Sequence, residues 1–200
     1  VYKFVQCKED VLIALATRMY QQRQGVFRKV LALPLTTPER IIATSLLDFS
    51  KVHMYSFDNQ LESIVNTEAM MKRCSERWLT QMITCGERCQ TMFQQFLQTA
   101  ADSGELVSGY RDIEEINVAT WSLSVGYFQT VHMHQNMQNV LDENIKDNAP
   151  RCTKGILMLA PDDHHINAMK RLVNSYDWQQ KVTANDITNI CEHLVDADLR

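Results

Sequence analysis

Apolar residues along this 200-residue chain recur mostly three or four positions apart, which is the spacing of one face of an α-helix. A typical series begins after Lys8 and places Val11, Leu15 and Met19 on one face. Strict alternation of apolar and polar residues, the mark of a half-buried strand, does not persist anywhere in the sequence. The pattern predicts seven helices, over residues 8–33, 38–52, 58–65, 67–101, 112–145, 164–176 and 184–198.

Polar residues, proline and glycine mark the ends of these helices. The segment 36–39, Thr-Thr-Pro-Glu, combines a capping threonine with a proline and an acid suited to a first helical turn. Asp112 is placed to cap the helix that follows it, and Gly104 supplies a left-handed stop for the helix before it. Residues 147–163 hold two prolines, a glycine and a short apolar insert, and therefore predict a loop.

Composition agrees with a mostly helical protein. Apolar residues make up 45 % of the chain and charged residues 22 %, which allows a substantial core. Six glycines and four prolines are few for this length, so long elements are favoured over a many-turned β fold, and we predict an all-α fold class. No apolar run approaches the roughly 20 residues of a membrane span, and we predict a cytoplasmic protein without membrane contact.

Charge and motifs narrow the possible functions. The net charge is −4, from 20 basic and 24 acidic residues, which is not that of a nucleic-acid-binding surface by itself. Six cysteines are irregularly spaced and predict reduced thiols, not a disulfide framework. The sequence has no glycine-rich phosphate loop and no Gly-x-Ser-x-Gly elbow. We therefore predict a protein that is not an enzyme and needs no cofactor.

Metal-binding patterns are weak. His132 and His134 lie two positions apart, so on a helix they point in different directions. The segment 162–165, Asp-Asp-His-His, has metal-capable side chains but also reads as a capped helix start. No Glu-x-x-His pair supports a di-iron bundle. We predict no metal site.

The first fifteen residues, VYKFVQCKEDVLIAL, place aromatic and basic side chains at a helix start. Cys7 stands at the cap position and Lys8 in the first turn, where a cation is unfavourable unless an anion is present. Tyr2 and Lys3 lie just upstream, within reach of the same anion. The stretch suits a corner that rests on a nucleic-acid phosphate. An ordinary helix start with an exposed lysine is the alternative.

This stretch resembles the end of the recognition helix and the start of the fourth helix in the TetR family of transcriptional regulators. Val1 and Tyr2 match the family's aliphatic-Tyr pair, and Lys8 with Glu9 matches its Lys-acidic helix start. Cys7 departs from the family, which usually has a serine cap there. Looser similarities occur at residues 37–40 (Thr-Pro-Glu-Arg), 103–106 (Ser-Gly-Glu-Leu) and 176–178 (Tyr-Asp-Trp).

The resemblance implies a TetR-like helical bundle that forms a two-fold dimer through a four-helix bundle. Residues 1–10 would end a helix-turn-helix DNA-binding domain whose base-reading helices lie upstream, and residues 11–200 would form the effector-binding and dimerisation domain. Operator DNA would be contacted at its phosphates by Tyr2, Lys3 and Lys8. The segments 112–145, 164–176 and 184–198 all remain possible sources of the interface, and the candidate residues are Met169, Leu172, Val173, Ile187, Ile190 and Leu194.

The predicted helix over residues 67–101 carries sulfur-containing and aromatic side chains on one face. Three interpretations are open: plain core, the lining of an apolar ligand cavity, and a thiol sensor or soft-metal site at Cys85 and Cys89. The next long helix holds two further aromatic residues, which are core by default and pocket lining by resemblance. The candidate ligand-binding residues are Trp78, Met82, Cys85, Cys89, Phe93, Trp121 and Phe128.

These features favour a ligand-responsive transcriptional regulator, a repressor released from operator DNA by a small, largely apolar effector. The effector would enter a cavity framed by the helices at residues 37–56, 67–101 and 112–128, and the helix beginning at Lys8 would connect this cavity to the DNA reader. A second hypothesis is a TetR-like helical carrier of lipids or other hydrophobic ligands that never binds DNA. The codons upstream of Val1 discriminate, since a basic three-helix pattern supports the regulator and an amphipathic or targeting segment supports the carrier.

Overall fold

The computed structural model describes residues 5–47, 58–141 and 163–197. Within these ranges every regular element is helical, which confirms the all-α class. The described elements are α1 (Lys8–Leu31), α2 (Thr37–Ser45), α4 (Asp58–Val65), α5 (Glu68–Arg73), α6 (Glu76–Asp102), the short 3₁₀ helix η1 (Gly109–Asp112), α7 (Ile113–Leu141), α8 (Asp163–Ser175) and α9 (Ala184–Asp196).

The helix predicted over residues 67–101 is in fact two helices, α5 and α6. Between them Cys74 is extended, with φ −77° and ψ 158°, and Ser75 occupies the N-cap position of α6. Thr67 starts α5 by accepting a hydrogen bond from the backbone N–H of Met70. The extended backbone at Cys74 therefore divides an apolar stripe that looks continuous in the sequence.

The helix predicted over residues 38–52 ends early. Leu46 is the C-cap of α2, and its N–H donates to the carbonyls of Ile42 and Ala43, which closes the last turn. Residues 48–57 lie outside the described part of the chain, as do the predicted extension of α7 beyond residue 141 and the predicted loop up to residue 162.

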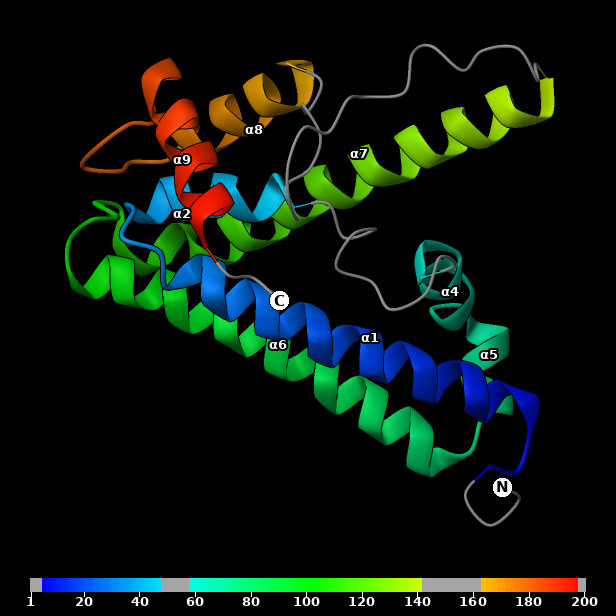
Figure 1. The fold of residues 1–200 in the computed structure, drawn as a ribbon. Coiled ribbons are helices and arrows are strands. Elements are labelled where there is room, and N and C mark those ends of the chain that lie inside the picture. Colours follow the sequence, from blue (N-terminus) through cyan, green and yellow to red (C-terminus); the bar gives the residue numbers. More distant parts are fainter. Residues whose placement is uncertain (1–4, 48–57, 142–162, 198–200) are drawn as a thin grey trace.

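Helices α1 and α6 run parallel and side by side through most of the molecule (Figure 1). Asp10 contacts the start of α6 at Ser75, and further along the pair the ring of Phe27 meets that of Phe93. Helices α2, α8 and α9 pack together over one end of the pair, while α4 and α5 lie near the start of α1 (Figure 1). Helix α7 packs on α6 and on α8.

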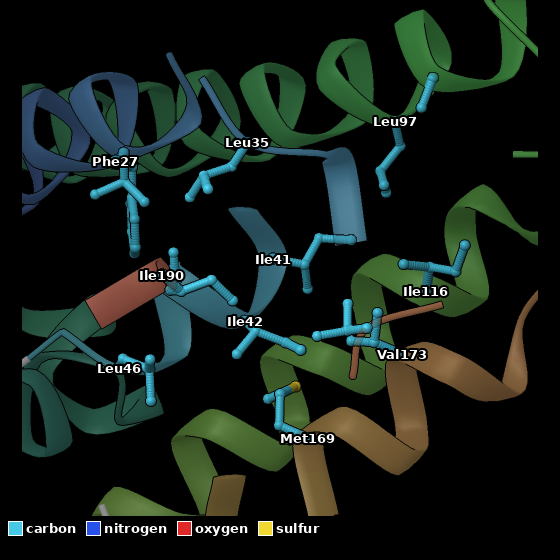
Figure 2. Packing of buried hydrophobic residues seen from close by; sticks show 14 of the residues in the cluster. Phe27, Leu35, Ile41, Ile42, Leu46, Leu97, Ile116, Met169, Val173 and Ile190 are labelled. Carbon is cyan, nitrogen blue, oxygen red and sulfur yellow. The ribbon is translucent and has the colours of Figure 1, made fainter. Parts of the chain in front are cut away.

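The main hydrophobic core joins the second halves of α1 and α6 with α2, the start of α7, α8 and α9 (Figure 2). Burying each of its large side chains contributes about 1.5–3 kcal/mol. Its central residues are Phe27, Ile41, Ile42, Leu46, Leu97, Ile116, Met169, Val173 and Ile190. A second, smaller cluster lies between α1, α4 and α6 and consists of Ile13, Ala16, Leu61, Val65 and Met82.

This core contains four of the six residues predicted for the dimer interface. Met169, Val173, Ile190 and Leu194 are at most 2 % exposed and belong to the core of the single chain. Their side chains pack in the same core as α2. The amphipathic pattern of α8 and α9 therefore marks packing within one chain. Of the six candidates, Leu172 and Ile187 are half-buried and pack against the same core.

The connection after α6 is held by the segment between α8 and α9. Leu106 and Trp178 form an antiparallel bridge, flanked by backbone hydrogen bonds of 2.7 and 2.9 Å. Gly104 has φ +78°, a left-handed conformation that glycine adopts without strain, and this confirms the predicted stop after α6. The bridge fixes the direction in which the chain enters α7.

Helix α7 is the longest described helix, with 29 residues. Near its start it leaves Val118 and Trp121 58 % and 45 % exposed, although both are large apolar side chains. Among the described helices, none combines the length and the apolarity that crossing a bilayer requires.

Candidate ligand-binding site

A cleft opens between α1, α2, α6 and α7, at the edge of the main core. Its floor is formed by Phe27, Leu97 and Ile116, which are at most 2 % exposed, and Trp121 stands at its solvent edge. The complete lining is Phe27, Ile41, Thr44, Phe93, Phe96, Leu97, Ile116, Asn117, Thr120, Trp121 and Ser124. The cleft lies between the helices that the sequence analysis named as the frame of a cavity.

Aromatic rings supply much of the apolar wall. Phe27 of α1 and Phe93 of α6 pack edge to face, with ring centroids 5.1 Å apart and planes at 76°. Phe96 lies one turn further along α6 and carries the guanidinium of Arg40 5.2 Å from its ring centroid. The same guanidinium donates a hydrogen bond of 2.8 Å to the carbonyl of Leu31, at the C-terminal end of α1. Arg40 therefore stabilises a helix end beside the cleft.

Polar groups enter the cleft from α2 and α7. The hydroxyls of Thr44, Thr120 and Ser124 donate to backbone carbonyls of their own helices, at 2.7, 2.7 and 3.0 Å. Each hydroxyl oxygen keeps lone pairs that can accept a hydrogen bond. Asn117 lies one turn before Thr120, is half-buried, and its side-chain amide bonds to no other described residue. The site thus combines aromatic surface with a short polar stripe.

The space in the cleft is small, about 50 Å³. Sites for drug-sized molecules typically have volumes of roughly 300–1,000 Å³. In this conformation the cleft holds a few heavy atoms, and anything larger requires a lining side chain to move. Trp121 is the lining residue best able to do so, because nearly half of it faces solvent.

Two of the predicted ligand-binding residues, Phe93 and Trp121, line the cleft. Trp78 and Met82 lie instead in or against the small cluster with α1 and α4, more than two turns before the cleft along α6. Neither residue lines the cleft, because the stripe on α6 faces two separate clusters in turn, and their role in ligand binding stays a prediction. The side chain of Phe128 lies outside the described part of the chain.

Cys85 and Cys89 also lie away from the cleft lining. Cys85 is buried with its thiol 3.9 Å from the carbonyl of Thr17, and Cys89 packs against the main core. Burial raises the pKa of the Cys85 thiol and raises that of Cys89 to about 11. Both thiols are therefore protonated near neutral pH, whereas thiol sensors and soft-metal ligands act as thiolates. Of the three interpretations of the stripe, core packing describes these two positions.

Sequence reasoning missed the polar stripe of α7 and the contribution of Phe27. Asn117, Thr120, Trp121 and Ser124 recur at intervals of three, four and seven positions, so they share one face of α7. Polar residues at this spacing, next to the apolar residues of the same helix, are a signal that was available in the sequence. Phe27 carried no such signal, because its neighbours become visible only when α1 and α6 are paired.

The predicted phosphate corner is described in part. Tyr2 and Lys3 lie outside the described residues. Lys8 is exposed in the first turn of α1, and Cys7 occupies the N-cap position without a capping hydrogen bond. The thiol of Cys7 instead contacts the carbonyl of Arg73 at 3.4 Å.

A buried carboxylate replaces the missing cap. Asp10 accepts hydrogen bonds from the backbone N–H of Gln6 at 2.9 Å and from that of Ser75 at 2.7 Å. These backbone donors, the Ser75 N–H first, lower the pKa of Asp10 to about 2. One side chain therefore organises the starts of both α1 and α6, and leaves Lys8 projecting from the corner.

Comparison with known proteins gives no relative. No protein-family model matches this chain, and neither a curated protein nor a solved structure is significantly similar to it. Among the described residues, no group of three or more His, Cys, Asp or Glu side chains is arranged to hold a metal ion. Helix α1 joins the cleft at Phe27 to the corner at Lys8.

Proposed function

We propose that this chain is the effector-binding body of a ligand-responsive transcriptional regulator of the TetR type, in which a small, largely apolar effector releases a repressor from operator DNA. The observation that carries the proposal is that α1 bears both candidate sites. Phe27 lies in the floor of the cleft and Lys8 at the exposed corner. The two residues are 19 positions apart, which corresponds to about 28 Å of helix.

The proposed mechanism is a population shift. Effector binding between α1, α2, α6 and α7 favours a position of α1 in which the corner no longer fits its phosphate. Moving from 99 % DNA-competent protein to 1 % requires about 5.5 kcal/mol of differential affinity for the two states. Asp10 makes α1 a suitable lever, because it ties the first turn of α1 to the start of α6.

A homodimer belongs to this proposal, since a two-fold protein matches two operator half-sites. Four of the residues first considered for the interface are interior, so the surface has to come from elsewhere. Val118 on α7 is an exposed apolar candidate, and large exposed apolar side chains are characteristic of interaction surfaces. Sedimentation equilibrium of the wild type and of Val118→Lys tests this surface.

The alternative, a lipid carrier without DNA binding, fits the cleft less well. About 50 Å³ is too little for an acyl chain, and the polar stripe of α7 suits a ligand with hydrogen-bonding groups. The cleft therefore favours a small effector over a lipid.

The test is DNA selection with the full-length gene product. A library of random DNA duplexes is enriched for the sequences that the protein binds. The affinity for the most enriched sequence is then measured by fluorescence anisotropy. We expect specific enrichment, and we expect Lys8→Ala to weaken selected and random DNA alike while lowering the slope of log affinity against log salt by about one. Lys29→Ala, at the other end of α1, is the matched control. Failure to enrich any sequence removes the regulator proposal.

A further inference from the structure

Asn117 is a polar residue of the cleft whose side-chain amide bonds to no other residue in the described part of the chain. Its amide offers two donor hydrogens and an acceptor oxygen, and none is used by another described residue. It is half-buried between aromatic and aliphatic side chains, where an unpaired amide is costly. Such a group is satisfied by water in the open cleft and can be satisfied by a polar atom of a ligand.

The hydroxyls around Asn117 define which polar atom fits. Thr44, Thr120 and Ser124 have already donated their protons to helix carbonyls, so they can only accept. A ligand that pairs with them must donate a hydrogen bond, and a ligand that pairs with the amide nitrogen of Asn117 must accept one. A hydroxyl group does both, whereas a ketone or an ether oxygen can only accept.

The rest of the lining defines the body of the ligand. Phe27, Phe93, Phe96 and Trp121 offer ring faces and edges, which an aromatic ring packs against favourably. All the lining side chains are uncharged, so an ion would lose its hydration without meeting an opposite charge. Arg40, beside the cleft, already donates to the carbonyl of Leu31.

The volume restricts the ligand to one ring. A dry cavity that binds benzene measures roughly 150 Å³, about three times the present space. Rotation of the exposed Trp121 side chain provides the missing room without disturbing the buried floor. A fused polycycle would also have to displace Leu97 or Ile116, which are core residues.

We infer that the cleft recognises small, neutral, single-ring aromatic molecules that carry a hydroxyl group, and that Asn117 is the residue that selects for the hydroxyl. This inference rests on the proposed function, because it names the chemical class of the effector for the same cleft.

The experiment compares phenol, toluene and benzoate at pH 7. Phenol and toluene differ in a hydroxyl against a methyl group of similar size, and benzoate adds a charge. Binding is followed by NMR through the indole N–H signal of Trp121, assigned by its loss in Trp121→Phe. The signal of Trp178 is the internal control, because that indole is buried elsewhere and donates to the carbonyl of Val173 at 2.9 Å.

We expect phenol to bind about 3- to 10-fold more tightly than toluene, the range that one or two neutral hydrogen bonds provide. Benzoate should bind most weakly. Asn117→Leu, which keeps the size of the side chain, should remove the preference for phenol while toluene still binds. Asn185→Leu, on the exposed start of α9, is the matched control and should leave the preference intact.

Each other outcome has its own meaning. Toluene binding as tightly as phenol overturns the inference and leaves the cleft as an effector site. Benzoate binding most tightly also overturns it, and shifts recognition toward Arg40. If no probe moves the Trp121 signal, the effector site itself is wrong, and the inference fails with it. The comparison of phenol with toluene uses the wild-type protein, so it does not depend on whether Asn117→Leu folds.

Discussion

Glu105 and Thr37, 68 positions apart, are joined by two short hydrogen bonds. The backbone N–H of Thr37 donates to Oε1 of Glu105 and the Thr37 hydroxyl donates to Oε2, each at 2.6 Å. Thr37 is the first residue of α2, where a carboxylate meets an otherwise unpaired N–H and the positive end of the helix dipole. Glu39 holds the same helix start from the other side, by accepting from Thr36 at 2.7 Å. Two acids thus fix the helix that forms one wall of the cleft.

Removing the first of these acids should destabilise the protein. We expect Glu105→Ala to lower the free energy of unfolding by about 1–3 kcal/mol, because two donors at the start of α2 lose their acceptor. Urea unfolding followed by circular dichroism measures the change. Glu87→Ala, at an exposed position of α6, is the control and should change stability by less than about 0.5 kcal/mol. Equal effects of the two substitutions would contradict the capping role.

The acid dependence of stability should depend on Asp10. The pKa of Asp10 is about 2 in the folded protein, against an ordinary value of 3.8 in an unfolded chain. The contribution of the Asp10 carboxylate to the free energy of unfolding is therefore fully present above about pH 4 and is lost as the pH falls through 2. Unfolding midpoints measured between pH 2 and 6 should therefore fall less steeply at the acid end in Asp10→Asn than in the wild type. Asp177→Asn, at an exposed carboxylate, should retain the wild-type slope. A mutant curve parallel to that of the wild type would refute the assignment.

The ion pair between α1 and α4 should contribute more to the free energy of unfolding than an ion pair on the surface does. Arg23 is 7 % exposed and its Nη1 donates to both carboxylate oxygens of Glu62, at 2.9 and 3.1 Å. Glu62→Gln leaves a buried cation without its partner charge, and we expect a loss of about 1–3 kcal/mol, reduced from the fully buried case because Glu62 is partly exposed.

The matched control is the exposed pair of Glu68 and Lys72, one turn apart on α5. Glu68→Gln should cost at most about 0.5 kcal/mol, since water screens this pair. Both variants are compared by urea unfolding at two salt concentrations. If Glu68→Gln lowered the free energy of unfolding more than Glu62→Gln, burial of Arg23 would not be what strengthens its ion pair with Glu62.

The thiol of Cys89 should resist alkylation. With a pKa of about 11, Cys89 has roughly a hundredth of the thiolate of an ordinary cysteine with a pKa near 9. Iodoacetamide labelling at pH 7.5, read by peptide mass spectrometry, should therefore be at least about 100-fold slower at Cys89 in the folded protein than in urea. Rapid labelling in the folded state would restore the thiol-sensor interpretation of Cys85 and Cys89.

Local signals predicted most of the fold. The spacing of apolar residues located the described helices, and the Thr36–Glu39 segment and Gly104 marked helix ends that the structure confirms. The division between α5 and α6 was missed because apolar residues recur at helical spacing on both sides of Cys74 and Ser75. The backbone N–H of Ser75 donates to Asp10, 65 positions earlier in the chain, and a local pattern does not show such a contact.

The site was predictable only in outline. The helices that frame the cleft follow from the order of elements, and Phe93 and Trp121 were found as large aromatic residues on them. Met82 packs in the small cluster with Ile13 and Leu61, which are 69 and 21 positions away in the sequence. The packing of neighbouring helices decides which part of a long apolar stripe faces a cleft and which part faces another helix. Helices α1 and α6 are far apart in the sequence, so a local pattern does not predict that they pack together.

The parallel arrangement of α1 and α6 has a consequence for how the protein is made. Contacts such as Asp10 with Ser75 join residues 65 positions apart, so α1 leaves the ribosome well before its partner exists. Because closing such long loops precedes the contacts that reward it, assembly should be slow for a helical protein of this size. The apolar side of the first helix must meanwhile stay unpaired, which makes the nascent chain a natural client for chaperones.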